Sequence, residues 1–131
     1  MKKLQQEQKE VHHITVKGNP VPMERARTSR GHFYLPERSK IWQSEVGWTV
    51  KQKIKKPLTC KLTVNLHFYR NTNHRCDIDN LVKNVLDGMM KIVYLDDSQI
   101  YALCAWKMFD RQNPRVEIII MGWDNGSSKK V

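Results

Sequence analysis

The stretch from Cys60 to Arg70 alternates apolar and polar residues along most of its length. Successive side chains of an extended chain point to opposite faces, so residues two apart in the sequence share a face. The apolar face of this stretch consists of Leu62, Val64, Leu66 and Phe68. The alternation predicts a β-strand that contributes one face to a hydrophobic core, and the fold must supply a second layer that packs on that face.

Two other segments have the spacing of amphipathic helices. Between Glu37 and Lys55, apolar residues recur every four positions, and Pro57 prevents this helix from continuing. A second helix is predicted from Asp79 to about Ile92. The predicted buried faces contain Trp42, Val46, Val50 and Ile54 in the first helix, and Leu81, Val85, Leu86, Met89 and Met90 in the second.

Three further strands are predicted, at residues 13–18, 100–109 and 115–122. The segment "DRQNP" between the last two has turn-forming residues, so we expect these two strands to form an antiparallel hairpin. Between residues 18 and 36, glycines and prolines exclude long regular elements. The order strand, helix, strand, helix, strand, strand predicts an α+β fold, a small mixed sheet of about four strands with two main helices packed on it.

A chain of 131 residues suits a single domain. We place this domain at residues 12–123, after a flexible polar segment at 1–11 and before a disordered tail at 124–131.

The charge balance constrains the partner more than the fold. The chain carries 23 Lys and Arg residues against 13 Asp and Glu, a formal net charge of +10 with a pI near 9.7. A polyanion is the expected partner, and nucleic acid is favoured over a membrane because no apolar run approaches transmembrane length. The first residues lack the apolar core of a secretory signal, and the three cysteines lack C-x-x-C spacing, which indicates reduced thiols. We therefore expect a cytoplasmic protein with no membrane association and no small-molecule cofactor.

Two groups of carboxylates stand out in this basic chain. Asp77 lies just before the second predicted helix, and Asp79, Lys83 and Asp87 follow at intervals of four, which places them on one helical stripe. A second pair, Asp96 and Asp97, precedes the strand at 100–109. Both groups lie at the ends of predicted elements, where their side chains can converge.

Converging carboxylates are the ligands that Mg²⁺ prefers, with water and substrate phosphate completing its shell. A metal held in this way polarises a scissile phosphate and activates water, and Lys83 would add a fixed positive charge beside the pentavalent transition state. Each acid also has a structural explanation. Asp77 or Asp79 alone fits a helix N-cap, the Asp79–Lys83–Asp87 row fits a solvated ion-pair ladder, and the Asp96–Asp97 pair fits a turn.

The segments "DIDNLVKNVLD" and "YLDDSQI" together resemble the signature of the RusA family of Holliday-junction resolvases. The segment "GNPVPMERAR" is similar to the family's G-x-P-V-P-x-x-R-x-R pattern, and the resemblance extends from Ile14 to Met121. It implies a small mixed sheet with helices, a symmetric homodimer, and a Mg²⁺-dependent endonuclease, with Mn²⁺ as a possible substitute, that resolves four-way DNA junctions by paired nicks.

The resemblance also assigns roles to individual residues. It implies that Asp77, Asp79 and Asp97 bind the metal and that Lys83 is the essential lysine. Asp96 matches the acid beside the third ligand and is assigned no definite role, and Asp87 is not expected to be catalytic. We expect Arg25, Arg27 and Arg75 to contact DNA. Aromatic residues that could stack on bases, but more often form core or dimer contacts, are Tyr34, Trp42, Trp48 and Trp106.

Two other functions remain open on sequence grounds. The chain could be a basic DNA-binding protein without catalysis, or a metal-dependent nuclease that acts on flaps, nicks or RNA.

Overall fold

A computed structural model describes residues 10–25, 27–34 and 36–124 of the chain. Most of the expected N-terminal segment and of the expected C-terminal tail, residues 1–9 and 125–131, lies outside the described residues. The first strand begins at Val11, next to the expected domain boundary.

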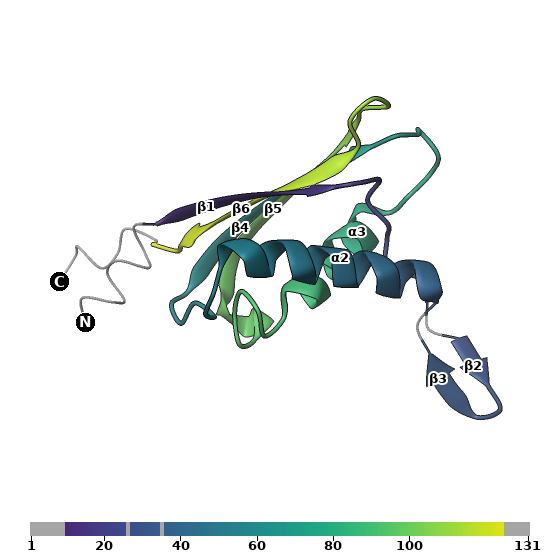
Figure 1. Cartoon of the computed structure of the whole chain (residues 1–131), viewed down its shortest axis with the longest axis horizontal. Coiled ribbons are helices and arrows are strands. Elements are labelled where there is room, and N and C mark those ends of the chain that lie inside the picture. The colour runs from purple at the N-terminus through teal and green to yellow at the C-terminus, as the bar shows by residue number, and fades with distance from the viewer. Residues whose placement is uncertain (1–9, 26, 35, 125–131) are drawn as a thin grey trace.

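The main sheet has four strands in the order β1-β6-β4-β5 (Figure 1). They are β1 (Val11–Lys17), β4 (Leu62–Arg70), β5 (Ile100–Phe109) and β6 (Arg115–Gly122). β4 pairs with β5 in parallel and with β6 in antiparallel fashion, and β6 also pairs with β1 in antiparallel fashion. The sheet is therefore mixed, and the predicted α+β class is confirmed.

The predicted hairpin between residues 100–109 and 115–122 is wrong, because β4 lies between β5 and β6. A helix long enough to make the crossover of a parallel pair connects β4 with β5, so β5 can join the far edge of β4. The connection after β5 then crosses the end of β4, where the Asp110 N–H donates to the Arg70 carbonyl at 2.7 Å. The Asp110 carboxylate accepts from the Gln112 and Asn113 N–H groups, which holds this short connection in shape.

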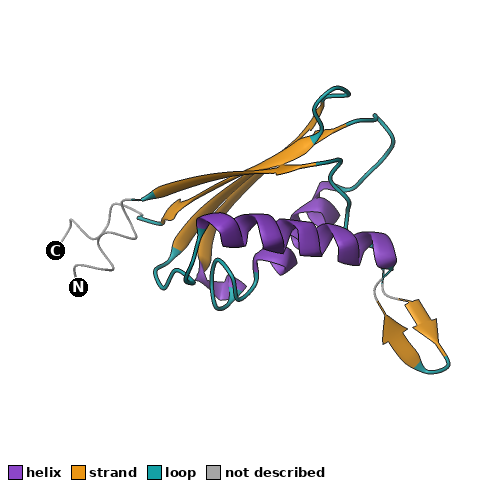
Figure 2. Ribbon diagram, in the orientation of Figure 1, coloured by secondary structure: helices purple, strands orange, loops and turns teal. Residues whose placement is uncertain are grey.

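Both long helices pack on one face of the sheet (Figure 2). They are α2 (Glu37–Lys53) and α3 (Ile78–Met89), each close to its predicted range. The apolar face of β4 is completely buried beneath them, as the alternation predicts. Trp42, Val46 and Val50 of α2 and Leu81, Val85 and Met89 of α3 complete the core.

A glycine on each helix lets α2 and α3 approach closely. A Cβ added at Gly88 would lie 2.9 Å from the Gln43 carbonyl oxygen and 3.1 Å from the Val46 Cβ. A Cβ added at Gly47 would lie 3.0 Å from the Gly88 carbonyl oxygen. The contact fixes which face of α3 turns toward the core and which faces solvent.

Two short strands, β2 (Arg27–Ser29) and β3 (His32–Tyr34), form a separate sheet in the segment where long elements were excluded. Arg30 and Gly31, between them, both have positive φ, as a two-residue type I′ turn requires.

The remaining side chains with sequence predictions divide between core and surface. Trp42 is in the core, whereas Trp48 is 68% exposed and Trp106 is 44% exposed. All three cysteines are free thiols. No helix in the described part of the chain is long and apolar enough to cross a membrane.

Substitution Gly88→Val should destabilise the fold by about 1–3 kcal/mol, because the added side chain overlaps the backbone of α2. The control is Ser44→Val, which adds the same side chain at an exposed position of α2. Chemical denaturation of both variants measures the difference. Equal stability of the two variants would contradict the close helix contact.

Candidate active site

One hollow on the surface brings together three of the four predicted catalytic residues, Asp79, Lys83 and Asp97, whereas Asp77 is not among the residues that line it. Its volume is about 440 Å³, and we call it the acidic hollow. It is lined by Asp79, Val82, Lys83, Leu86, Asp87, Asp97 and Leu103. α3 supplies the Asp79–Lys83–Asp87 stripe as predicted, because its opposite side, with Leu81 and Val85, is buried.

Asp97 reaches this hollow through a tightly bonded turn before β5. Asp96 caps the short 3₁₀ helix η1 (Asp97–Gln99): its carboxylate accepts from the Ser98 N–H at 3.1 Å. The Gln99 side chain accepts from the Leu95 N–H and donates to the Leu58 and Cys60 carbonyls. Asp96 therefore has the structural role that a turn predicts, and Asp97 is the member of the pair that faces the hollow.

The side chain of Tyr94 connects the same turn to α3. Its side chain is completely buried, and its hydroxyl donates to the Leu86 carbonyl at 2.6 Å. Burial, and then the negative charges of Asp97, Asp87 and Asp96, raise the pKa of this hydroxyl. The neutral phenol thus holds the turn that carries Asp97 against the helix that carries Asp87.

The structural explanations for the other acids find little support. Asp77 is the N-cap residue of α3, but its side chain makes no capping hydrogen bond. Among the described residues, the Asp79 carboxylate accepts only from the adjacent Asn80 N–H, at 2.9 Å. Within the described residues, Lys83 forms no salt bridge with Asp79 or Asp87, so the row is not an ion-pair ladder.

Asp87 is a member of the site that sequence reasoning set aside. It lies two helical turns from Asp79 and is half-buried. Partial burial raises the pKa of its carboxyl, Lys83 opposes this shift, and the negative charge of Asp97 adds to it. Its place on the predicted polar stripe was the signal that could have identified it.

The acidic side chains that line the hollow are carboxylates, and carboxylate oxygens are ligands of the kind that a hard cation prefers. Among residues 10–25, 27–34 and 36–124, however, no three His, Cys, Asp or Glu side chains lie close enough together to hold a metal ion. Ionised carboxylates repel one another, and Asp77, Asp79 and Asp97 are exposed. Joint coordination by these three would therefore require side-chain rotation.

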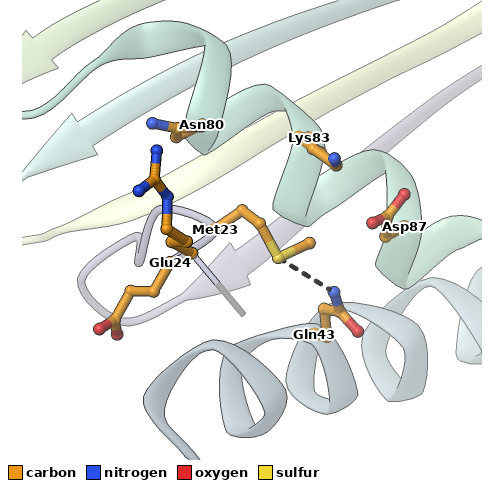
Figure 3. Close-up of a pocket in the computed structure, with 7 residues that line it drawn as sticks. Met23, Glu24, Gln43, Asn80, Lys83 and Asp87 are labelled. Atoms are coloured by element: carbon orange, nitrogen blue, oxygen red, sulfur yellow. Dashed lines mark hydrogen bonds between the residues drawn. The ribbon is translucent and has the colours of Figure 1, made fainter. Parts of the chain in front are cut away.

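A second hollow, of about 580 Å³, adjoins the acidic hollow along Lys83 and Asp87, which line both. Figure 3 shows it between α3, α2 and the segment at Met23 and Glu24. Arg25 also lines it, which places this predicted DNA contact near Lys83.

Hydrogen bonds from α3 fix the segment that precedes Arg25. The buried Asn84 side chain donates to the Val21 carbonyl at 2.9 Å and to the Ser39 carbonyl at 3.4 Å. The Met23 N–H donates to the Asn80 carbonyl at 2.8 Å. The two asparagines of "DNLVKN" therefore join the proline-rich segment to the helix of the candidate site.

Arg75 lies elsewhere, on a hollow of about 240 Å³ formed by the loop between β4 and α3 and the end of β5. Arg70 and Lys107 hold this loop by donating to the carbonyls of His74 and Cys76. Arg75 itself is exposed. Arg27 belongs to β2, but its side chain lies outside the described residues.

A comparison with known protein families identifies the family of this chain. The family model of endodeoxyribonuclease RusA matches residues 17–121, which is most of the chain. The chain therefore belongs to an endodeoxyribonuclease family, and that family is RusA. The uncharacterised protein YqaN of Bacillus subtilis strain 168 is 27% identical over 133 residues, covering 82% of this chain and 93% of that protein.

The convergence of Asp87, Lys83 and Asp97 can be tested by titration. Asp97→Asn should lower the pKa of the Asp87 carboxyl toward its ordinary value of 3.8, and Lys83→Met should raise it further. Carboxyl NMR measures both shifts. Because the pKa of Asp87 is raised in the folded state, its contribution to the free energy of unfolding should increase as the pH falls toward 3.8.

The control for this titration is Asp96→Asn, since Asp96 is not among the charges that shift the pKa of Asp87. An Asp87 pKa that does not respond to Asp97→Asn would place the two carboxylates farther apart than the hollow requires.

Proposed function

We propose that this protein is a Mg²⁺-dependent endonuclease that resolves four-way (Holliday) DNA junctions. The observation that carries the proposal is the acidic hollow, which gathers Asp79, Lys83 and Asp97 in a chain of the RusA endodeoxyribonuclease family. The net charge of +10 suits a DNA substrate.

Asp77, Asp79 and Asp97 are the residues that would hold the metal ion. When bound, such an ion polarises the scissile phosphate and lowers the pKa of a bound water. Lys83 adds a positive charge one helical turn from Asp79, where it stabilises charge that develops on the phosphate. Arg25, which lines the adjoining hollow, orients the DNA backbone.

The decisive substitution is Asp79→Asn, which removes a metal ligand without changing the size of the side chain. We expect metal-dependent cleavage of a four-way junction to fall by about 100-fold or more, while DNA affinity is retained or increases. Asp96→Asn is the matched control, because Asp96 caps η1 outside the hollow. Cleavage and gel-shift assays on one synthetic junction measure both quantities.

If Asp79→Asn cuts at the rate of the unmodified protein, the assignment of the site is wrong and a basic DNA-binding protein remains. Parallel assays on duplex, flap and RNA substrates test the junction preference. Equal rates on all of them would leave a less selective metal-dependent nuclease.

We also propose a homodimer, because a two-fold protein can present one site to each of two opposed junction strands. The candidate interface is the face of the sheet that the helices leave uncovered (Figure 2). His67 alternates with the buried Leu66 and Phe68 of β4, so it lies on this uncovered face. Its cross-strand partner Trp106 stacks on it with ring centroids 4.4 Å apart. Arg115 on this face is neutralised locally, because it pairs with Glu117 at 3.0 Å and with Asp110 at 3.1 Å. Neutralised charges of this kind lower the repulsion that a second copy of a strongly basic chain would meet.

Trp106→Glu should increase the monomer fraction, because it places an unpaired charge in this interface. The control is Trp48→Glu, an exposed tryptophan of α2 on the helical side of the sheet. Sedimentation velocity over a range of concentrations measures the distribution. A dimer that tolerates Trp106→Glu as well as Trp48→Glu would exclude this face as the interface.

A further inference from the structure

The β2–β3 hairpin extends beyond the N-terminal end of α2, away from the main sheet (Figure 1). Every described side chain from Thr28 to Tyr34 is exposed. Phe33 is 80% exposed, the largest exposed fraction among the large hydrophobic residues of the described chain. A Cβ placed on Gly31 would have no atom within 4 Å among the described residues beyond its chain neighbours, so there is open space at this position of the turn.

This exposed hairpin nevertheless has a fixed base. Ser39, completely buried, accepts from the Glu24 N–H at 3.1 Å and donates to the Pro22 carbonyl at 3.2 Å. Ser39 follows the hairpin in the sequence, whereas Pro22 and Glu24 precede it, so these bonds join its two ends. Asn84 of α3 then bonds to both sides of the same base, through the carbonyls of Val21 and Ser39. The hairpin is thus attached to the helix that carries Lys83.

The positive charge of this region favours DNA as the partner of the hairpin. Residues 25–40 contain five Arg or Lys residues and one Glu, and Arg30 lies in the turn itself. A second copy of the hairpin would bring like charges together, whereas DNA phosphates compensate them. An exposed aromatic ring among cations is the arrangement that proteins use to stack on unpaired bases while holding the backbone.

We propose that the hairpin is a junction-reading element: Phe33 stacks on an unpaired base at the branch point while Arg30 contacts the adjacent phosphate. The inference rests on the proposed function, because it takes branched DNA as the ligand. An isolated two-stranded hairpin is only marginally stable, so contact with DNA also orders it further. The hairpin takes part in no covalent step. It affects the affinity for DNA and the preference for branched over linear DNA.

The test measures binding without cleavage, on the full chain in EDTA, with a four-way junction that carries 2-aminopurine at the branch point. Phe33→Ala and Phe33→Leu should weaken junction binding by about ten-fold and abolish the change in 2-aminopurine fluorescence. Phe33→Tyr, which retains the ring, should preserve both. Thr28→Ala is the matched control, because Thr28 is the cross-strand partner of Phe33 and carries no ring.

Affinity for linear duplex should change little in the Phe33 variants, whereas Arg30→Gln should weaken junction and duplex binding alike. Unchanged junction affinity and fluorescence in Phe33→Ala would overturn the proposal. So would failure of the unmodified protein to bind branched DNA, or a shift of Phe33→Ala from dimer to monomer in sedimentation. If the unmodified protein binds the junction in a Phe33-dependent way but does not cleave it, the proposed catalysis is refuted and the role of the hairpin is supported.

Discussion

The close contact of α2 and α3 at Gly47 and Gly88 is the constraint on which the candidate site depends. Each position leaves no room for a Cβ without displacement of the other helix, so the rotation of α3 about its axis is fixed. With Leu81 and Val85 directed into the core, the Asp79–Lys83–Asp87 stripe has to face outward. The same α3, lying between two parallel strands, brings the turn with Asp97 to that exposed side. Packing of apolar surface thus decides where the charges lie.

Hydrogen bonds to α3 also hold the loops that surround the candidate site. Asn84 is buried in the helix interface, yet it bonds to backbone on both sides of the β2–β3 hairpin. The buried Tyr94 acts in the same way for the turn that carries Asp97, through the Leu86 carbonyl of α3. Buried polar groups need hydrogen-bond partners, so both side chains join a loop to α3. The polar segments nearest the candidate site are therefore held by the helix that forms its floor.

Much of this architecture is readable from periodicity. The strand at β4, the two helices and their buried faces follow from alternation and from four-residue spacing, because those patterns arise locally. The order of strands does not, and the wrong hairpin between β5 and β6 shows why. Turn-forming residues predict that the chain reverses direction, but they do not predict which strand pairs with the strand that follows the turn. Whether β4 enters between β5 and β6 depends on the crossover through α3, which is a property of the whole sheet.

The sequence by itself determined the family, the acidic and basic residue types, and the stripe of α3 on which Asp79 and Lys83 lie, since all of these are written in local spacing and composition. The resemblance already distinguished Asp97 from Asp96, but only the tertiary structure showed that Asp96 is a cap and added Asp87 to the hollow. The tertiary structure alone showed Phe33 exposed on a hairpin anchored to α3. The reason is that exposure and convergence depend on segments distant in sequence, which meet only when the core has packed.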